Sequence, residues 1–405
     1  MSSMSGGPPG PATDDQAFTD HDRRARLRYL LTHVRHGGAD LGEYRFAAQR
    51  AGRDRESWYT TWHGLAERTR ARAERRLRTA GGTGAGEDLL RASTYYRMAE
   101  LALPPHLLAS EPGAFRASRE CFRRALDRFD RPARAVEIPF EGGSLPGFLL
   151  TARPGPAPTL VVITGLDGTA EEGYFLTGAA ALTRGYHCLV FDGPGQGAPL
   201  RERGTTLRPD WESVIVPTLD LLGLRPEVDP ERIVLVGQGF GGYLAARAAS
   251  HDHRPAALVT DPGLVDLEAA IVARMGPELV ERIVAGDPTV EPALRSSLRP
   301  EHGFSRERGL RSCGTVSHRE FLYLMLGFRL DPSGIRCPTL VCDQATDVRL
   351  GHQARMLYEG LGGRKDYVLF TAEDGAEPEQ HGLGRAVAGV VFDWLDEILG
   401  RGSRG

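Results

Sequence analysis

Residues 232–250, RIVLVGQGFGGYLAARAAS, decide the fold of this 405-residue chain. The β-branched run 233–236 predicts one short buried strand, and the alanine-rich run 243–249 predicts a helix. The turn between them has glycines at its first and fifth positions, as in the nucleophile elbow G-x-S-x-G. Its third position is Gly239, which has no hydroxyl, thiol or carboxylate. The sequence therefore predicts a complete elbow with a vacant nucleophile position.

Apolar strands alternate with helices on both sides of this turn. Strands are expected at 134–140, 145–151, 159–164, 187–192, 256–260, 339–342 and 367–370, the first two as a hairpin. Helices are expected at 171–184, 211–222, 352–361 and 387–399. Continuous apolar strands separated by helices are typical of a mostly parallel sheet that is covered on both faces.

The rest of the chain divides by composition. A glycine- and proline-rich start predicts a flexible tail, and helical spacing with interleaved arginines follows it. The segment between the strands at 256–260 and 339–342 is too long for an ordinary loop, so it predicts an inserted cap. The expected parts are a tail at 1–16, a helical lid region at 17–130, core segments at 131–261 and 334–400, and the cap at 262–333.

Composition narrows the class of protein. The formal net charge of −3 does not favour nucleic-acid binding. No apolar run reaches the length of a membrane span, and the N-terminal residues lack the basic start and apolar core of a secretion signal, so we expect a cytoplasmic protein. The five cysteines are odd in number and show no C-x-x-C spacing. We therefore expect buried free thiols, no metal and no cofactor.

An acid and a histidine follow the elbow in the order expected of catalytic residues. An elbow, then an acid after a later strand, then a histidine after the last strand is the order of an Asp–His catalytic pair. Asp347 and His381 occupy these places. The acid would hold the imidazole in one tautomer and stabilise its charged form. Asp343 is the alternative acid, although its place nearer the strand end also suits a structural cap or turn.

An oxyanion hole is expected from backbone N–H groups. One would come from Phe240, which follows the vacant position, and the other from Gly165 or Leu166 in the loop after the strand at 159–164. Neither group depends on the missing hydroxyl. The elbow can therefore still bind a negatively charged oxygen with Gly239 in place of serine.

Four segments together resemble one group of α/β-hydrolases, and the likeness covers roughly residues 55–400. They are GLDGTAEEGYF (165–175), VFDGPGQG (190–197), RPEVDPERIVLVGQGFGGYLAARAA (225–249) and TLVCDQATD (339–347). The group includes fermentation–respiration switch-like esterases, dihydroxypseudooxynicotine hydrolase and fungal naphthopyrone chain-shortening hydrolases. The resemblance implies the α/β-hydrolase fold, an N-terminal helical part that helps to cover the site, and ester or carbon–carbon hydrolysis in some members.

The chain departs from this group at two positions. Gly239 replaces the nucleophilic serine, and Thr164 stands where the oxyanion loop usually begins with histidine. The acid and histidine positions match Asp347 and His381. Other candidate pocket residues are Asp167, Glu171, Glu172 and the atypical Gln238. Glu171 and Glu172 equally suit the N-terminus of a helix, where the dipole favours negative charge.

Three functions remain open. In the first, His381 with Asp347 acts as general base on a small-molecule carbonyl substrate, polyketide-like by analogy, for elimination, C–C cleavage, cyclisation or water-mediated hydrolysis. In the second, the chain is a non-catalytic binding module, because a fold does not decide a function. In the third, it is an inactivated ester or C–C serine hydrolase. We favour the first, because a decayed pocket has no reason to keep both the acid and the histidine.

A homodimer is the expected assembly. The N-terminal helices carry four large aromatic residues, Trp58, Trp62, Tyr95 and Tyr96, which could pack on the sheet or on a second subunit. The resemblance favours the second of these. Apart from a small-molecule substrate, no other partner is expected, neither nucleic acid nor membrane.

Overall fold

A mostly parallel sheet organises the computed structural model, which describes residues 18–79, 82–104, 112–129, 133–297, 303–345, 352–374 and 385–400. The strand order is β1-β2-β4-β3-β5-β6-β7-β8. The strands are β1 Ala133–Phe140, β2 Gly143–Leu150, β3 Ala157–Ile163, β4 His187–Phe191, β5 Val228–Gln238, β6 Ala257–Asp261, β7 Thr339–Gln344 and β8 Lys365–Phe370. β2 pairs antiparallel with β1 and β4, and the pairs from β4 to β8 are parallel. This is the α/β-hydrolase fold that the sequence predicts.

Helices cover both faces of the sheet because its central strands are apolar on both sides. Every residue of β3 and β4 is buried, and neighbouring residues such as Val161 and Val162 belong to different cores. One face packs against α6 Ala170–Gly173, α7 Ala179–Thr183 and α17 Arg385–Ile398. The other packs against α9 Glu212–Gly223, α10 Gly241–His251 and α16 Gln353–Gly360.

The predicted helix at 171–184 is interrupted. A π-helical turn, Tyr174–Gly178, lies between α6 and α7. All five residues of the turn are buried, and Phe175 stacks on His33 of the N-terminal helices with ring centroids 4.9 Å apart. Such a turn inserts a residue into the helix and re-aims the side chains around it. The apolar pattern alone did not predict this break.

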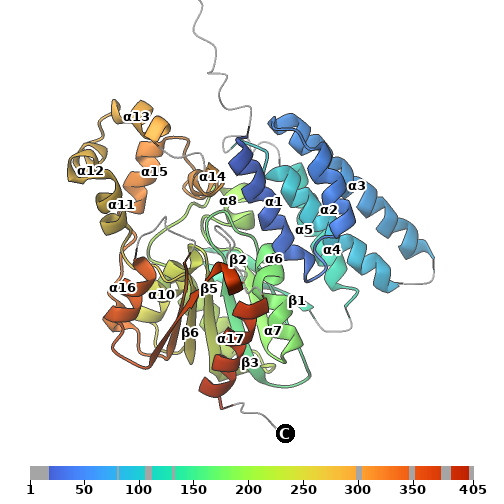
Figure 1. Ribbon diagram of the computed structural model, residues 1–405. Coiled ribbons are helices and arrows are strands. Elements are labelled where there is room, and N and C mark those ends of the chain that lie inside the picture. The colour runs from blue at the N-terminus through green and yellow to red at the C-terminus, as the bar shows by residue number, and fades with distance from the viewer. Residues whose placement is uncertain are drawn as a thin grey trace, which may run out of the picture.

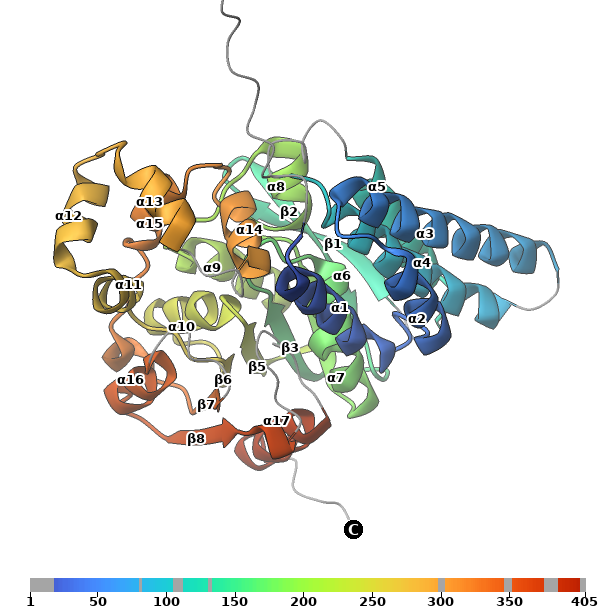
Figure 2. The same cartoon turned by 45° about the horizontal axis from the view of Figure 1, so that its top comes forward.

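The N-terminal helices form a layer beside the sheet (Figures 1 and 2). They are α1 Asp20–Val34, α2 Leu41–Arg50, α3 Arg55–Arg78, α4 Gly82–Glu100 and α5 Gly113–Leu126. Trp58, Trp62, Tyr95 and Tyr96 are fully buried inside this layer, and the Trp62 ring lies 5.9 Å from that of Trp58 and 6.0 Å from that of Tyr95. These four aromatic residues are therefore not available to a second subunit.

The inserted segment between β6 and β7 is helical. Its helices are α11 Leu267–Met275, α12 Pro277–Val284, α13 Val290–Ser297, α14 Gly303–Ser312 and α15 His318–Met325. A small core of Ile283, Val290, Leu294 and Leu322 holds α11, α12, α13 and α15 together. Figure 2 shows α14 between the other cap helices and α1. A short helix that the sequence did not predict, α8 Gly197–Arg203, follows β4. None of the helices in the described ranges has the length and apolar character of a membrane span.

Candidate active site

Gly239 lies at a sharp turn between β5 and α10. Its φ of +58° is in the left-handed region, which side chains other than glycine rarely adopt. The Gly239 N–H donates to the Asp261 carbonyl at 2.7 Å, and the Gly242 N–H donates to the Gly239 carbonyl at 3.0 Å. A methyl group added at Gly241 would collide with the carbonyl oxygen of Ile163, so this position requires glycine. The turn has the strained geometry of an elbow without its usual side chain.

The loop after β3 lies against this turn. An ideal Cβ added at Gly165 would lie 2.9 Å from the backbone nitrogen of Phe240, so loop and elbow are in close contact. Among the described residues, the N–H groups of Gly165, Leu166 and Phe240 have no hydrogen-bond acceptor. Gly239 is buried, whereas Phe240 is partly exposed. The elbow and the loop that contacts it thus carry three N–H donors with no acceptor in the part of the chain that the structure describes.

The other polar backbone groups of this loop are occupied. The Gly165 carbonyl accepts from the Gly168 N–H at 3.1 Å, and the Leu166 carbonyl accepts from Arg308 Nε at 2.8 Å. The Asp167 N–H donates to Ser312 Oγ, and the Asp167 carbonyl accepts from Arg97 Nη2 at 2.6 Å. The N–H groups of Gly165, Leu166 and Phe240 have no acceptor among the described residues, and the three residues are partly exposed, so these groups are candidates for binding a ligand.

Sequence reasoning missed Gln196. This buried side chain follows β4, and its Nε2 donates to the carbonyls of Thr164 at 2.6 Å and Gly165 at 3.2 Å. Its Oε1 accepts from the Gly193 N–H at 3.1 Å. The glycine-rich run GPGQG around Gln196 could have pointed to it, since such a run permits close backbone approach. Gln196 therefore braces the start of the loop.

Two of the predicted pocket acids, Asp167 and Glu172, form buried ion pairs with arginines. The Asp167 carboxylate is fully buried and forms ion pairs with Arg201 at 2.6 Å, Arg97 at 3.3 Å and Arg311 at 3.4 Å. Burial alone would raise the pKa of Asp167, but these arginines outweigh it and hold the pKa well below its usual range. Glu172 is paired with Arg308 at 3.0 Å and Arg97 at 2.9 Å. Both arginines overcome the effect of burial and lower the pKa of Glu172 to about 2.

Glu171 differs from these two acids. Burial and then the neighbouring Asp192 carboxylate raise its pKa, with Arg119 opposing them. Its Oε1 has no hydrogen-bond partner and lies 3.8 Å from Arg119 Nε. Glu172 is also the N3 residue of a capping box with Thr169, as the helix-terminus interpretation expects.

Gln238 and Thr164 flank the turn. Gln238 Nε2 donates to Thr177 Oγ1 of the π-helical turn, while its buried Oε1 has no partner. The hydroxyl of Thr164 is also buried without a hydrogen-bond partner. Gln238 thus joins the elbow to the helix that covers this face of the sheet.

Of the two candidate acids for the catalytic pair, the structure describes Asp343 and not Asp347. Asp343 accepts from the Tyr367 hydroxyl at 2.6 Å and from the Gln344 N–H at 2.8 Å, both near the C-terminal end of the sheet. This gives Asp343 a structural role between β7 and β8. Asp347 and His381 lie outside the described residues, so their pairing stays a prediction.

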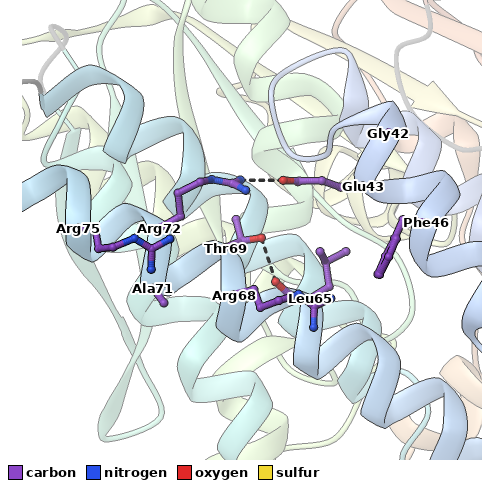
Figure 3. Close-up of a pocket in the computed structure, with 9 residues that line it drawn as sticks. All are labelled: Gly42, Glu43, Phe46, Leu65, Arg68, Thr69, Ala71, Arg72 and Arg75. Atoms are coloured by element: carbon purple, nitrogen blue, oxygen red, sulfur yellow. Dashed lines mark hydrogen bonds and ion pairs between the residues drawn. The ribbon is translucent and has the colours of Figure 1, made fainter.

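A pocket in the helical layer lies elsewhere (Figure 3). Its volume is about 510 Å³, and residues of α2 and α3 alone line it. Arg72 is paired there with Glu43 at 2.7 Å, and Arg68, Arg75 and Phe46 complete most of the rim. No residue of the elbow or of the loop at 165–168 lines this pocket, so it is distinct from the candidate active site.

The described residues hold no group of three or more histidine, cysteine or acidic side chains that could bind a metal ion. The five cysteines are free, and four of them are buried. Burial raises the pKa of Cys313 to about 12 and that of Cys337 to about 11, so both thiols stay protonated at neutral pH.

Comparison with known proteins places this chain in a family. Residues 160–376 match the alpha/beta hydrolase family, and residues 50–261 match the family described as esterase FrsA-like. The 2,6-dihydroxy-pseudo-oxynicotine hydrolase structure superposes with a TM-score of 0.72 at 21% identity, over 94% of this chain and 97% of that chain. At this identity the superposition shows the fold.

Two fungal proteins are similar along nearly their whole length. Hydrolase LUC6 from a Fusarium species is 32% identical over 399 residues, covering 90% of this chain and 93% of LUC6. The 20-hydroxy-prefusarin hydrolase FUS2 of Gibberella moniliformis is 32% identical over 400 residues, covering 91% of this chain and 94% of FUS2. The fold, the elbow and these matches agree, and the chain belongs to the alpha/beta hydrolase family.

Proposed function

We propose that this alpha/beta hydrolase-type enzyme acts without a covalent serine nucleophile. His381, oriented by Asp347, is the general base, and the N–H groups of Phe240 and Leu166, with Gly165 beside them, bind the oxygen that becomes negative during the reaction. The observation that carries this proposal is the complete turn around Gly239 beside three N–H donors that have no acceptor among the described residues. A site that had lost its function would have no need to keep such donors free.

The vacant position favours chemistry on a bound water or on the substrate itself. Without a hydroxyl at residue 239, no acyl-enzyme forms at the elbow, and the space admits a water molecule or a bulkier substrate. The base then removes a proton from water or from a C–H or O–H bond of the substrate. Elimination, C–C cleavage, cyclisation and water-mediated hydrolysis all require this base and an oxyanion hole.

The relatives support a small-molecule substrate. LUC6 and FUS2 are both named hydrolases, and FUS2 is named for 20-hydroxy-prefusarin. We therefore take a polyketide-like carbonyl compound as the substrate class, with 20-hydroxy-prefusarin as the first compound to test.

A fluorophosphonate probe tests the site without knowledge of the substrate. The probe phosphonylates an activated serine hydroxyl: an O–P bond forms, fluoride leaves, and the histidine takes the hydroxyl proton. We expect no labelling of the site in the wild-type protein and labelling at residue 239 in Gly239→Ser. Adding His381→Ala should abolish that labelling. A folded Gly239→Ser protein that is not labelled would overturn the proposed site, and labelling of another side chain in the wild-type site would reveal a different nucleophile.

Turnover distinguishes an adapted enzyme from an inactivated one. With a converted substrate in hand, His381→Ala should lower kcat by about 10²-fold or more, the usual share of general acid–base catalysis. Gly239→Ser should not raise the native rate, because its hydroxyl occupies the space of the substrate or water. A much faster Gly239→Ser protein, with no loss in His381→Ala, would instead indicate a disabled serine hydrolase. Tight binding of the compound without turnover would indicate a binding module.

A further inference from the structure

Helix α14 of the cap holds one peptide group of the candidate oxyanion loop at both ends. This peptide joins Leu166 to Asp167. Its carbonyl oxygen accepts from Arg308 Nε at 2.8 Å, and its N–H donates to the hydroxyl of Ser312. Arg308 and Ser312 are one helical turn apart, so both lie on the same face of α14. The cap therefore controls the orientation of this peptide.

The neighbouring peptides are held as well. The Gly165 carbonyl belongs to the same peptide as the Leu166 N–H, and it accepts from Gly168 and Gln196. The Asp167 carbonyl accepts from Arg97 of α4. Because a peptide group is planar, anchoring its carbonyl determines the direction of its N–H. The direction of the Leu166 N–H thus depends directly on Gly168 and Gln196 of the core, while the cap and the N-terminal layer hold the peptides that follow it.

Buried ion pairs strengthen the contacts between α14 and the loop at 165–168. Arg308 also pairs with Glu172 at 3.0 Å, and Arg311 pairs with Asp167 at 3.4 Å. Asp167 itself has a φ of +52°, a conformation that persists in a residue with a side chain only when its surroundings enforce it. The arginines that surround Asp167 provide that enforcement. Charged hydrogen bonds of this kind are stronger and more directional than neutral ones.

We propose that Arg308 and Ser312 are positioning residues of the oxyanion hole, so that docking of the cap completes the hole. This rests on the proposed function, because it assumes that the Leu166 N–H binds the developing negative charge. The cap is then part of the catalytic apparatus as well as a cover. When α14 leaves the loop, the peptide between Leu166 and Asp167 loses both anchors, and the peptide that carries the Leu166 N–H keeps only its contacts with Gly168 and Gln196.

The chain offers a matched control on the same helix. Glu307, next to Arg308, pairs with Arg26 of α1 and Arg55 of α3. Glu307→Gln therefore weakens ion pairs between α14 and the N-terminal layer, whereas Arg308→Gln weakens the ion pair between α14 and Glu172 of the core. Glu307→Gln removes no contact with residues 165–168. Ser312→Ala is a milder second variant, which deletes one hydroxyl and leaves the arginines in place.

The first measurement is the rate of fluorophosphonate labelling in a Gly239→Ser background. We expect Arg308→Gln and Ser312→Ala each to slow labelling by about tenfold or more, because a small misplacement of a catalytic group is costly. The labelling rate of Glu307→Gln should stay within about twofold of the parent rate, because this variant leaves the loop contacts in place. Its thermal stability should fall, because it weakens two ion pairs of the cap. Equal rates for Arg308→Gln, Ser312→Ala and Glu307→Gln would overturn the proposal.

The second measurement does not depend on catalysis. Amide hydrogen exchange at residues 166–168 of the otherwise wild-type protein should be faster in Arg308→Gln and Ser312→Ala than in Glu307→Gln. Unchanged exchange would overturn the positioning role. If Gly239→Ser is not labelled at all, the proposed function fails, and the exchange result still decides whether α14 positions the loop.

Discussion

At the scale of single residues, the site depends on which polar atoms the fold leaves unsatisfied. The N–H groups of Gly165, Leu166 and Phe240 have no acceptor among the described residues, although the carbonyls around them are bonded. All three residues are partly exposed, so these donors are open to solvent and to a bound ligand. Binding of a negatively charged oxygen would use them.

His33 gives a prediction at the same scale. It is buried with both ring nitrogens unpartnered, and burial lowers its pKa to about 4. Between pH 6.5 and 4 the unfolded chain protonates His33 more readily than the folded protein does. The free energy of unfolding is therefore unaffected by His33 above pH 6.5 and decreases as the pH falls below that value. The decline is at most about 1.4 kcal/mol per pH unit. His33→Phe keeps a ring beside Phe175 and should remove this decline.

Urea unfolding at pH 7 and pH 5 measures the effect. His33→Phe should lose less stability between the two pH values than the wild-type protein. The exposed His253 provides the control, and His253→Gln should behave as wild type. The same loss in His33→Phe as in wild type would show that another group causes the acid sensitivity.

At the scale of elements, the contact between β3, β5 and α10 depends on glycine. A methyl group at Gly241 would meet the backbone carbonyl oxygen of Ile163, which cannot move without disturbing the sheet. Gly389 lies in the middle of α17, and the described residues leave open space where its Cβ would be. The same substitution should therefore have opposite effects at these two positions.

Gly241→Ala should destabilise the protein by roughly 1–3 kcal/mol, the cost of forcing atoms into a packed interior. Gly389→Ala should stabilise it by roughly 0.5–1 kcal/mol, because alanine loses less backbone entropy in a helix. Thermal or urea unfolding of both variants checks this pair. A Gly241→Ala protein as stable as wild type would mean that the elbow is not packed as tightly as described.

At the scale of the whole molecule, buried ion pairs join three segments that are distant in sequence. Arg97 of the N-terminal layer, Arg201 of α8 and Arg311 of the cap meet at Asp167 of the core. A buried charge that loses one partner is strongly destabilising. The helical layer, the cap and the sheet are therefore linked energetically at the candidate site.

The homodimer is a prediction that belongs to this scale. Its basis in the sequence is weakened, because Trp58, Trp62, Tyr95 and Tyr96 pack within the helical layer. The exposed apolar side chains include Val284, Val316 and Tyr323 of the cap region, which are 50–55% exposed. Sedimentation velocity at micromolar concentration tests the expectation directly. A single species with the mass of one chain would end it.

The sequence by itself determined the alternation of strands and helices, the glycine turn and the inserted cap. These features depend on local rules: side-chain periodicity along a strand or helix, and the space that only glycine leaves. Local rules also placed the loop at residues 165–168 beside Phe240, because parallel strands end at the same edge of the sheet.

Only the tertiary structure decided what the polar residues near that edge do. Asp167 and Glu172 suited a pocket by sequence, but their carboxylates are bound by arginines from α4, α8 and α14. Gln196 and Arg308, which hold the loop, escaped prediction for the same reason. These hydrogen bonds and ion pairs join residues that are separated by 31 to 145 positions in the sequence. They produce no periodic pattern in the sequence, because they depend on how packed elements bring two side chains together.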